Sequence, residues 1–328
     1  MNRRKNNPII SIIIPSYNRA HLIGRAIKSV LNQTYQEFEL IIVDDASKDN
    51  TEEIVKSFND KRIIYIRHKT NKGAQAARNT AIYASQNEWI AFLDSDDEWL
   101  PNRLEAGLAI AHKTDFSVIH SECFIKKGRN NNLKIFGIPH KSGYLYKNLL
   151  KWPGPMFQGL LVKRKCLEDI GYLDENIISY QEWDTSIRLA RYYNFGYVRK
   201  PLFIYHCHEG KTISKDKKRN IDGWAQIVEK HHKDIREIAG KKALQHHYIN
   251  LALNYSLIKE FEIASKYYYK AELDIGLRKI IYNLQLFLIK MHINPNILDI
   301  DTVFKYIIKY LTNFISRKNY NELKKDFK

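Results

Sequence analysis

The sequence predicts an α/β fold in which a mainly parallel β-sheet is flanked by helices and is followed by an α-helical C-terminal region. Two apolar runs, residues 9–14 and 38–43, consist mostly of Ile, Leu and Val, as strands covered on both faces do. A helical pattern from His21 to Gln33 lies between them, and a third apolar run follows at residues 90–93. This alternation of apolar strands and helices is typical of a parallel sheet.

Polar clusters stand at the carboxyl ends of three of these strands, where ligands bind in such sheets. They are residues 15–19, Asp44 with Asp45, and residues 94–96. Asp45 can accept a hydrogen bond from a base N–H, Tyr17 can stack on the base, and Arg19 is placed for a phosphate. The alternative for Asp44, Asp45 and Ser47 is a turn or a helix cap.

The third strand leads into four carboxylates, Asp94, Asp96, Asp97 and Glu98. Asp94 and Asp96 are separated by one residue, so at a strand end they can point the same way and offer hard oxygen ligands to Mg²⁺ or Mn²⁺. A solvated loop, or a cap for the helix that starts near Asn102, is the competing interpretation.

An alanine-rich stretch, residues 74–84, predicts a helix that follows Gly73 and carries Arg78 and Asn79 in its early turns. Gly73 permits close approach of the backbone to a ligand. Arg78 either reaches the ligand pocket or lies exposed on a surface helix.

Four blocks, in this order and spacing, resemble the inverting family 2 glycosyltransferases with the GT-A fold. They are residues 15–19, 43–51, 71–79 and 92–97. The resemblance covers roughly the first two thirds of the chain. It implies transfer of a sugar from a nucleotide diphosphate donor, most often a UDP-sugar, with Mn²⁺ or Mg²⁺ as cofactor.

The resemblance also implies roles for individual residues. Pro15, Tyr17, Asp45 and Arg78 would hold the nucleoside, Asp94 the ribose and the metal, and Asp96 the metal. The whole set expected to bind the nucleotide is Pro15, Tyr17, Arg19, Asp44, Asp45, Lys72, Gly73, Arg78, Asp94 and Ser95. The expected metal ligands are Asp94, Asp96 and His208.

Inverting transfer needs a carboxylate that removes the acceptor hydroxyl proton, and either Glu182 or Asp184 can do this. The family's spacing to Arg188 places the base at Glu182, with Gln181 where the family usually has an acid. Asp184 remains the competitor. Both acids also suit the N-terminal end of a helix that runs to Tyr193.

Residues 205–208 resemble the family's Tyr-Arg-x-His block, in which the histidine approaches the metal or the diphosphate. His208 fits that place, and His206 stands where an arginine is common. A zinc site is disfavoured because neither Cys123 nor Cys166 has a second ligand at close spacing.

Two tryptophans, Trp152 and Trp183, are the residues expected to contact the acceptor, because sugar rings stack on aromatic faces. Each fits the hydrophobic core equally well.

The excess of 53 Lys and Arg over 36 Asp and Glu gives a net charge of +17. No RRM, zinc-finger or helix-turn-helix pattern would use it on nucleic acid. The charge therefore predicts peripheral attachment to an anionic membrane that carries a glycan or lipid-linked acceptor, or else reflects the composition of an AT-rich genome. Three widely spaced cysteines and the lack of a long apolar leader predict a cytoplasmic location, at the inner face of the cell membrane.

A strongly polar stretch, residues 211–220, predicts a boundary between a catalytic domain, residues 1–215, and a helical domain, residues 216–328. The helical domain is expected to serve as a packing element of the chain or to form a homo-oligomer. Two other functions compete with the transferase. A sugar nucleotidyltransferase lacks support because no glycine-rich phosphate loop follows the first strand, and the intact acidic blocks count against a non-catalytic nucleotide-sugar-binding scaffold.

Overall fold

The structure is a computed structural model that describes residues 10–127, 133–137, 142–207 and 215–271. The chain separates into two compact units, and the boundary lies between Asp234 and Ile235. The sequence places that boundary near residue 215. The difference is the helix α8 (Lys217–Asp234), which packs within the first unit.

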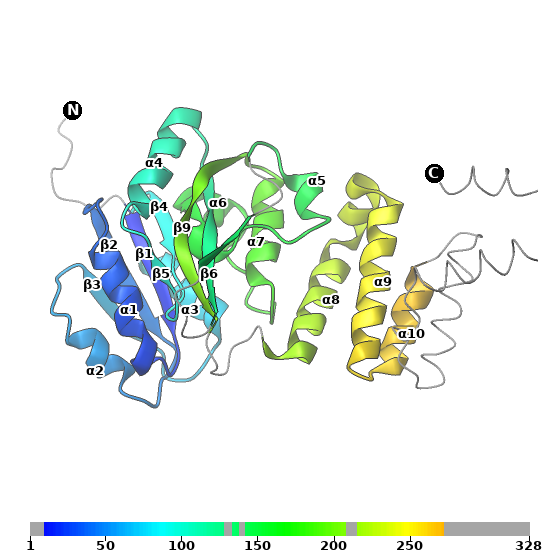
Figure 1. The fold of residues 1–328 in the computed structure, drawn as a ribbon, viewed down its shortest axis with the longest axis horizontal. Helices are drawn as coiled ribbons and strands as arrows, with labels where there is room; N and C mark the ends of the chain where they lie inside the picture. The colour runs from blue at the N-terminus through cyan, green and yellow to red at the C-terminus, as the bar shows by residue number, and fades with distance from the viewer. Residues whose placement is uncertain (1–9, 128–132, 138–141, 208–214, 272–328) are drawn as a thin grey trace, which may run out of the picture. The chain divides into compact units, whose positions relative to one another are not determined.

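The strands of the first unit form one mixed sheet (Figure 1). Their order across it is β3 (Ile63–Arg67), β2 (Phe38–Asp44), β1 (Ile10–Ser16), β4 (Trp89–Phe92), β8 (Leu161–Lys163), β6 (Val118–Lys127), β9 (Phe195–Cys207) and β5 (Glu98–Trp99), with β7 (Leu133–Phe136) paired to β6. Strands β3, β2, β1 and β4 are parallel, whereas β8 and β5 run antiparallel to their neighbours. The predicted α/β class is confirmed.

Helices cover the parallel half of the sheet. The helix α1 (Ala20–Leu31) buries Ile23, Ala26, Ile27 and Val30, which lie on one helical face, in the same core cluster as Ile12 and Ile14 of β1. Alternate strand residues such as Ile13 point to the opposite face. The helix α3 (Ala74–Ala84) packs against β1 and β2 outside that cluster, so it covers this second face.

The remaining helices of the first unit are short except for α4 and α8. They are α2 (Thr51–Lys56), α4 (Arg103–Thr114), α5 (Tyr146–Leu149), the 3₁₀ turn η1 (Phe157–Gly159), α6 (Arg164–Asp169) and α7 (Gln181–Ala190).

Helix α8 lies directly against the segment that precedes α7. The Ile178 N–H donates to Gln226 Oε1 at 3.1 Å, and Ser179 Oγ donates to Asn220 Oδ1 at 2.6 Å. A Cβ on Gly223 would lie 2.6 Å from the Ser179 Cβ and 2.9 Å from its backbone N and O. Only glycine therefore permits this approach of α8 to the loop before α7.

The described part of the second unit consists of a π-helical turn, η3 (Ile235–Ala239), and the helices α9 (Lys241–Leu257) and α10 (Phe261–Lys270). Tyr255 of α9 stacks on Tyr267 of α10, with ring centroids 5.6 Å apart. In the described ranges no helix is both long and apolar enough to cross a membrane.

Candidate functional site

The polar clusters predicted at strand ends meet at one edge of the sheet. Ser16 pairs with Asp44 in the parallel register, and the Asp45 N–H donates to the Ser16 carbonyl at 2.8 Å. The turn after β4 joins them, because the Leu93 N–H donates to the Ile13 carbonyl at 3.0 Å. Parallel pairing of β1 with both β2 and β4 therefore builds this part of the site.

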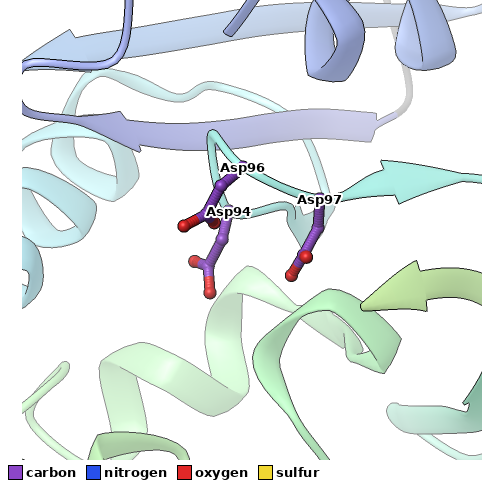
Figure 2. Close-up of side chains that lie close together, drawn as sticks. All are labelled: Asp94, Asp96 and Asp97. Carbon is purple, nitrogen blue, oxygen red and sulfur yellow. The ribbon is translucent and has the colours of Figure 1, made fainter. Parts of the chain in front are cut away.

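Three carboxylates, Asp94, Asp96 and Asp97, come from the turn between β4 and β5. Each offers an oxygen within 4.8 Å of the oxygens of the other two. Figure 2 shows all three side chains extending from this turn towards the same side. Burial raises the pKa of Asp94, as does the nearby charge of Asp96, while Arg78 lowers it.

Gln158 of η1 binds two of these carboxylates. Its Nε2 donates to Asp94 Oδ2 at 2.8 Å and to Asp97 Oδ2 at 2.6 Å. The Gln158 carbonyl in turn accepts from Trp99 Nε1 at 3.0 Å and from Arg103 Nε at 3.4 Å. Arg103 is itself buried, and burial lowers its pKa to about 9.

Asp97 is held more tightly than its neighbours. It is 1% exposed, and its second oxygen accepts the His206 N–H at 2.8 Å. Burial and the charges of Asp96 and Asp94 raise its pKa well above the usual value. Asp96 instead forms an ion pair with Arg19, at 3.7 Å between Nε and Oδ2, and its carbonyl accepts from Arg25.

Arg78 joins three elements of the site. Its Nη2 donates to Asp94 Oδ1 at 2.7 Å, and its Nη1 donates to Gln75 at 2.9 Å and to Gln181 Oε1 at 3.1 Å. The guanidinium lies over the Phe157 ring, 4.3 Å from its centroid. Arg78 is 5% exposed, so it is not a surface arginine, and it links α3, the acidic turn and the start of α7.

Asp45 organises the loop that follows β3. Its carboxylate accepts the N–H groups of Lys72 at 2.8 Å and Gly73 at 2.7 Å, and it contacts His68 Nδ1 at 2.8 Å. Gly73 has a φ of 95°, which glycine adopts without strain. Asp45 is thus buried against its own chain, and it sets the conformation of residues 68–73.

Asp44 is fully buried. Its two oxygens accept from the Ser47 N–H at 2.7 Å and from the Tyr65 hydroxyl at 2.6 Å. Burial and the hydrogen bond to Asp44 raise the pKa of Tyr65. This arrangement fixes the turn after β2.

A cavity of about 670 Å³ opens beside this turn. It is lined by Tyr17, Ala46, Ser47, Lys48, Arg67, His68, Lys69, Thr70 and Asn71. Tyr17 is 41% exposed, whereas Pro15 and Ser95 are buried. The cavity combines an aromatic ring, cations and amide groups, which are the groups that recognise a base and its phosphates.

Glu182 lies in the first turn of α7, half-buried. Burial raises the pKa of its carboxyl, while the Arg78 charge lowers it and the Asp94 charge raises it. Within the described ranges its carboxylate forms no hydrogen bond or ion pair with another side chain. A carboxylate whose pKa is raised by burial is a stronger proton acceptor than an ordinary glutamate.

Asp184 has the opposite environment. It is 1% exposed, and its oxygens meet Arg188 Nε at 3.0 Å, His231 Nε2 at 2.8 Å and Lys230 Nζ at 2.8 Å. Burial alone would raise the pKa of Asp184, but these three partners outweigh it and lower the pKa to about 2. Asp184 therefore anchors α8 to α7.

The two predicted acceptor tryptophans differ in exposure. Trp152 is 49% exposed, so its ring can meet a ligand. Trp183 is 1% exposed and its indole N–H donates to the Leu149 carbonyl at 2.6 Å, so it offers no face to a sugar. His208 lies outside the described residues, whereas His206 contacts Glu98 at 3.6 Å.

Several residues of the site carry no local sequence signal. Gln158 reaches Asp94 from 64 positions away, and His231 reaches Asp184 from 47 positions away. His68, at the end of β3, holds Asp45 and lines the cavity. Single polar residues of this kind are found only when the fold brings distant segments together.

Comparison with known proteins identifies the family. Residues 11–171 match the model described as Glycosyl transferase family 2. The putative colanic acid biosynthesis glycosyl transferase WcaA of Escherichia coli K12 is 34% identical over 250 residues, which cover 73% of this chain and 86% of that protein. WfgD of Escherichia coli, a UDP-Glc:alpha-D-GlcNAc-diphosphoundecaprenol beta-1,3-glucosyltransferase, is 43% identical over 228 residues, or 67% of this chain and 87% of that protein.

Solved structures resemble the fold. TarS of S. aureus in complex with UDP-GlcNAc superposes with a TM-score of 0.65 at 18% identity, over 88% of each chain. The mannosyltransferase PcManGT from Pyrobaculum calidifontis, in complex with GDP-Man and Mn²⁺, gives a TM-score of 0.58 at 16% identity over 89% of this chain and 87% of that one. With relatives of this identity and coverage, the chain belongs to glycosyl transferase family 2 and is a glycosyltransferase with the GT-A fold.

Proposed function

We propose that this chain is a metal-dependent inverting glycosyltransferase that moves a sugar from a UDP-sugar to a hydroxyl of a glycan or lipid-linked acceptor, with Glu182 as the general base. The contrast between Glu182 and Asp184 carries the proposal. Among the described residues Glu182 has no side-chain partner and its pKa is raised beside the acidic turn, whereas Asp184 has three cationic or imidazole partners.

In the proposed reaction Glu182 removes the proton of the acceptor hydroxyl while that oxygen attacks the anomeric carbon of the donor. The bond between the anomeric carbon and the diphosphate oxygen breaks, and its electron pair leaves with UDP. The proton remains on Glu182 until solvent removes it. Attack from the face opposite the diphosphate inverts the configuration at the anomeric carbon.

The acidic turn fits a divalent cation. The oxygens of Asp94, Asp96 and Asp97 are hard ligands that lie within 4.8 Å of one another. Asp97 is 1% exposed, whereas the side chains of Asp94 and Asp96 are 31% and 20% exposed, so we assign Asp94 and Asp96 as the metal ligands. A bound Mn²⁺ or Mg²⁺ would neutralise charge on the departing diphosphate.

The cavity supports the assignment of the nucleotide. Tyr17 is exposed for stacking, and Arg67, Lys48 and Lys69 supply positive charge around the lining. Asp45 acts in this proposal through the loop that it holds. Arg78 acts by fixing Asp94 and the start of α7. The name of WfgD, which specifies a UDP-glucose donor and a diphosphoundecaprenol acceptor, supports a UDP-sugar and a lipid-linked acceptor.

The decisive experiment is the change Glu182→Gln, which removes the base and keeps the shape of the side chain. We expect kcat to fall by about 100-fold or more, with UDP affinity unchanged in calorimetry, because general-base catalysis contributes on the order of 10²–10⁴. Glu168→Gln on α6 is the matched control and should keep full activity. Near-normal turnover by Glu182→Gln would contradict the assignment of the base.

A further inference from the structure

The strand β7 exposes three large apolar side chains. Leu133 is 42% exposed, Ile135 63% and Phe136 45%. Large apolar side chains at such exposure, gathered on a strand that pairs only with β6 among the described strands, mark an interaction surface or an aggregation risk.

The register with β6 places these side chains on definite faces. Ile135 lies opposite Phe124, and Leu133 lies opposite Lys126. Residues directly opposite each other share a face, as do alternate residues of one strand. One face of the hairpin therefore carries three apolar side chains, Phe124, Leu133 and Ile135, together with the ammonium group of Lys126.

The charge of the hairpin favours a membrane as the occupant. Lys126, Lys127 and Lys134 flank the apolar side chains, and Glu122 is the one acid on the described parts of β6 and β7. A lysine can bury its carbon chain in an interface while its ammonium group meets lipid phosphates. Exposed apolar residues with surrounding cations match the headgroup and acyl boundary of an anionic bilayer.

The hairpin also lies beside the active-site edge of the sheet. In the parallel register of β6 with β9, Lys126 pairs with His206 and Lys127 with Cys207. The His206 N–H is the group that donates to Asp97 of the acidic turn. Figure 1 shows β6 and β9 side by side over this stretch.

We propose that the β6–β7 hairpin is the part of the catalytic unit that contacts an anionic membrane surface. Leu133 and Ile135 enter the interface, and Lys126, Lys127 and Lys134 bind anionic headgroups. This contact would hold a lipid-linked acceptor next to the acidic turn. In that last respect the inference rests on the proposed function.

The test is partition of the full chain between buffer and sedimented vesicles of phosphatidylcholine, with or without phosphatidylglycerol at three parts in ten. We expect partition onto the anionic vesicles to fall about tenfold in the double variant Leu133→Ser with Ile135→Ser. Ile64→Ser is the matched control, because Ile64 is 40% exposed on the opposite edge strand, β3. The control should bind as the unchanged chain does.

The lysines are tested separately. Each of Lys126→Gln, Lys127→Gln and Lys134→Gln should lower binding to anionic vesicles by about fivefold, since one surface cation contributes on the order of 1 kcal/mol. Equal binding of the unchanged chain to the neutral and the anionic vesicles would overturn the role of the lysines. Equal binding of the double variant and the unchanged chain would overturn the role of the hairpin.

Two further measurements separate this inference from its alternatives. Hydrolysis of UDP-sugar in vesicle-free buffer should be the same in the double variant and in the unchanged chain. If the unchanged chain does not hydrolyse UDP-sugar, the proposed function is contradicted, and vesicle binding stands as a separate result. Light scattering tests whether a second copy of the chain binds the hairpin instead. A dimer that forms in the unchanged chain and is lost in the double variant would assign the hairpin to that second copy and overturn the membrane contact.

Discussion

Asp96 differs from the two other acids of its turn in how it is held. Gln158 and Arg78 donate hydrogen bonds to Asp94, and Gln158 and the His206 N–H donate to Asp97. The Asp96 carboxylate instead lies at a longer distance, 3.7 Å, from Arg19 Nε. A carboxylate that is partly exposed can reorient towards a cation at little cost in stability.

We expect Asp96→Ala to abolish the metal dependence of UDP binding and to lower turnover by about 100-fold or more, because the change removes a ligand oxygen. The free energy of unfolding should change by less than about 1 kcal/mol, as for an ion pair that solvent reaches. UDP titrations with and without Mn²⁺ measure the first effect and urea unfolding the second. Glu88→Ala, at an exposed acid, is the control, and a metal response that survives Asp96→Ala would rule out the ligand.

The raised pKa of Glu182 predicts the pH dependence of transfer. A general base acts in its deprotonated form, so the rate falls as the pH drops through the pKa of that group. Because burial raises this pKa, the acid limb of kcat/KM should lie above the ordinary pKa of a glutamate, 4.5. Glu182→Asp, which keeps a carboxylate at a greater distance, should retain an acid limb at reduced rate, whereas Glu182→Gln should lose it. An acid limb that remains in Glu182→Gln would point to another base.

At the scale of elements, Asp184 determines how α7 meets α8. Its carboxylate forms ion pairs with Arg188 of its own helix and with Lys230 and His231 of α8. Lys230 also forms an ion pair with Asp174, at 2.7 Å. Removing one member of a buried charge network leaves the others without compensation. The arrangement thus ties the position of Glu182 to α8.

We expect Asp184→Asn to lower the free energy of unfolding by about 3 kcal/mol, in the range for a broken buried pair. Since the folded pKa is depressed to about 2, the carboxylate stabilises the fold fully above its ordinary pKa of 3.8, and this contribution disappears as the pH falls through 2. Denaturant unfolding between about pH 2 and pH 7 measures both the loss in the variant and its dependence on pH. Asp174→Asn, at a more exposed partner of Lys230, should cost far less, and equal costs would contradict the central role of Asp184.

The elements could be predicted from the sequence where their signal is local. A pattern of about a dozen residues is enough to predict β1, β2, β4 and the alanine-rich helix α3. The same holds for the acidic pair Asp94 and Asp96 at the end of β4. Gln158 and Lys230 could not be predicted, because nothing near either residue indicates its partner. The choice between Glu182 and Asp184 likewise depends on α8, which lies in the polar and helical region assigned to another domain.

At the scale of the whole molecule, the boundary between the units decides which truncations are informative. A chain that ends at residue 240 keeps α8 and its contacts with α7, whereas one that ends at residue 215 removes Lys230, His231 and Gly223 together. We expect the chain that ends at residue 240 to unfold cooperatively and to hydrolyse UDP-sugar at a rate within about twofold of the full chain. The chain that ends at residue 215 should lose its cooperative unfolding transition, because it leaves Asp184 with fewer partners.

Thermal unfolding and donor hydrolysis of the two truncated chains distinguish these cases. If both chains unfold alike and hydrolyse donor alike, α8 contributes nothing to the catalytic unit. Loss of folding in the longer chain would show instead that α9 and α10 are needed for the stability of the first unit.

The contact between Gly223 and Ser179 has a consequence for native-state motion. Because α8 has no spare space against the segment before α7, the two helices cannot open one at a time without breaking the same set of contacts. Their amide protons should therefore exchange with solvent deuterium in a single opening event. The acidic turn, set by Gln158 and not by α8, can stay protected while that event exposes Glu182.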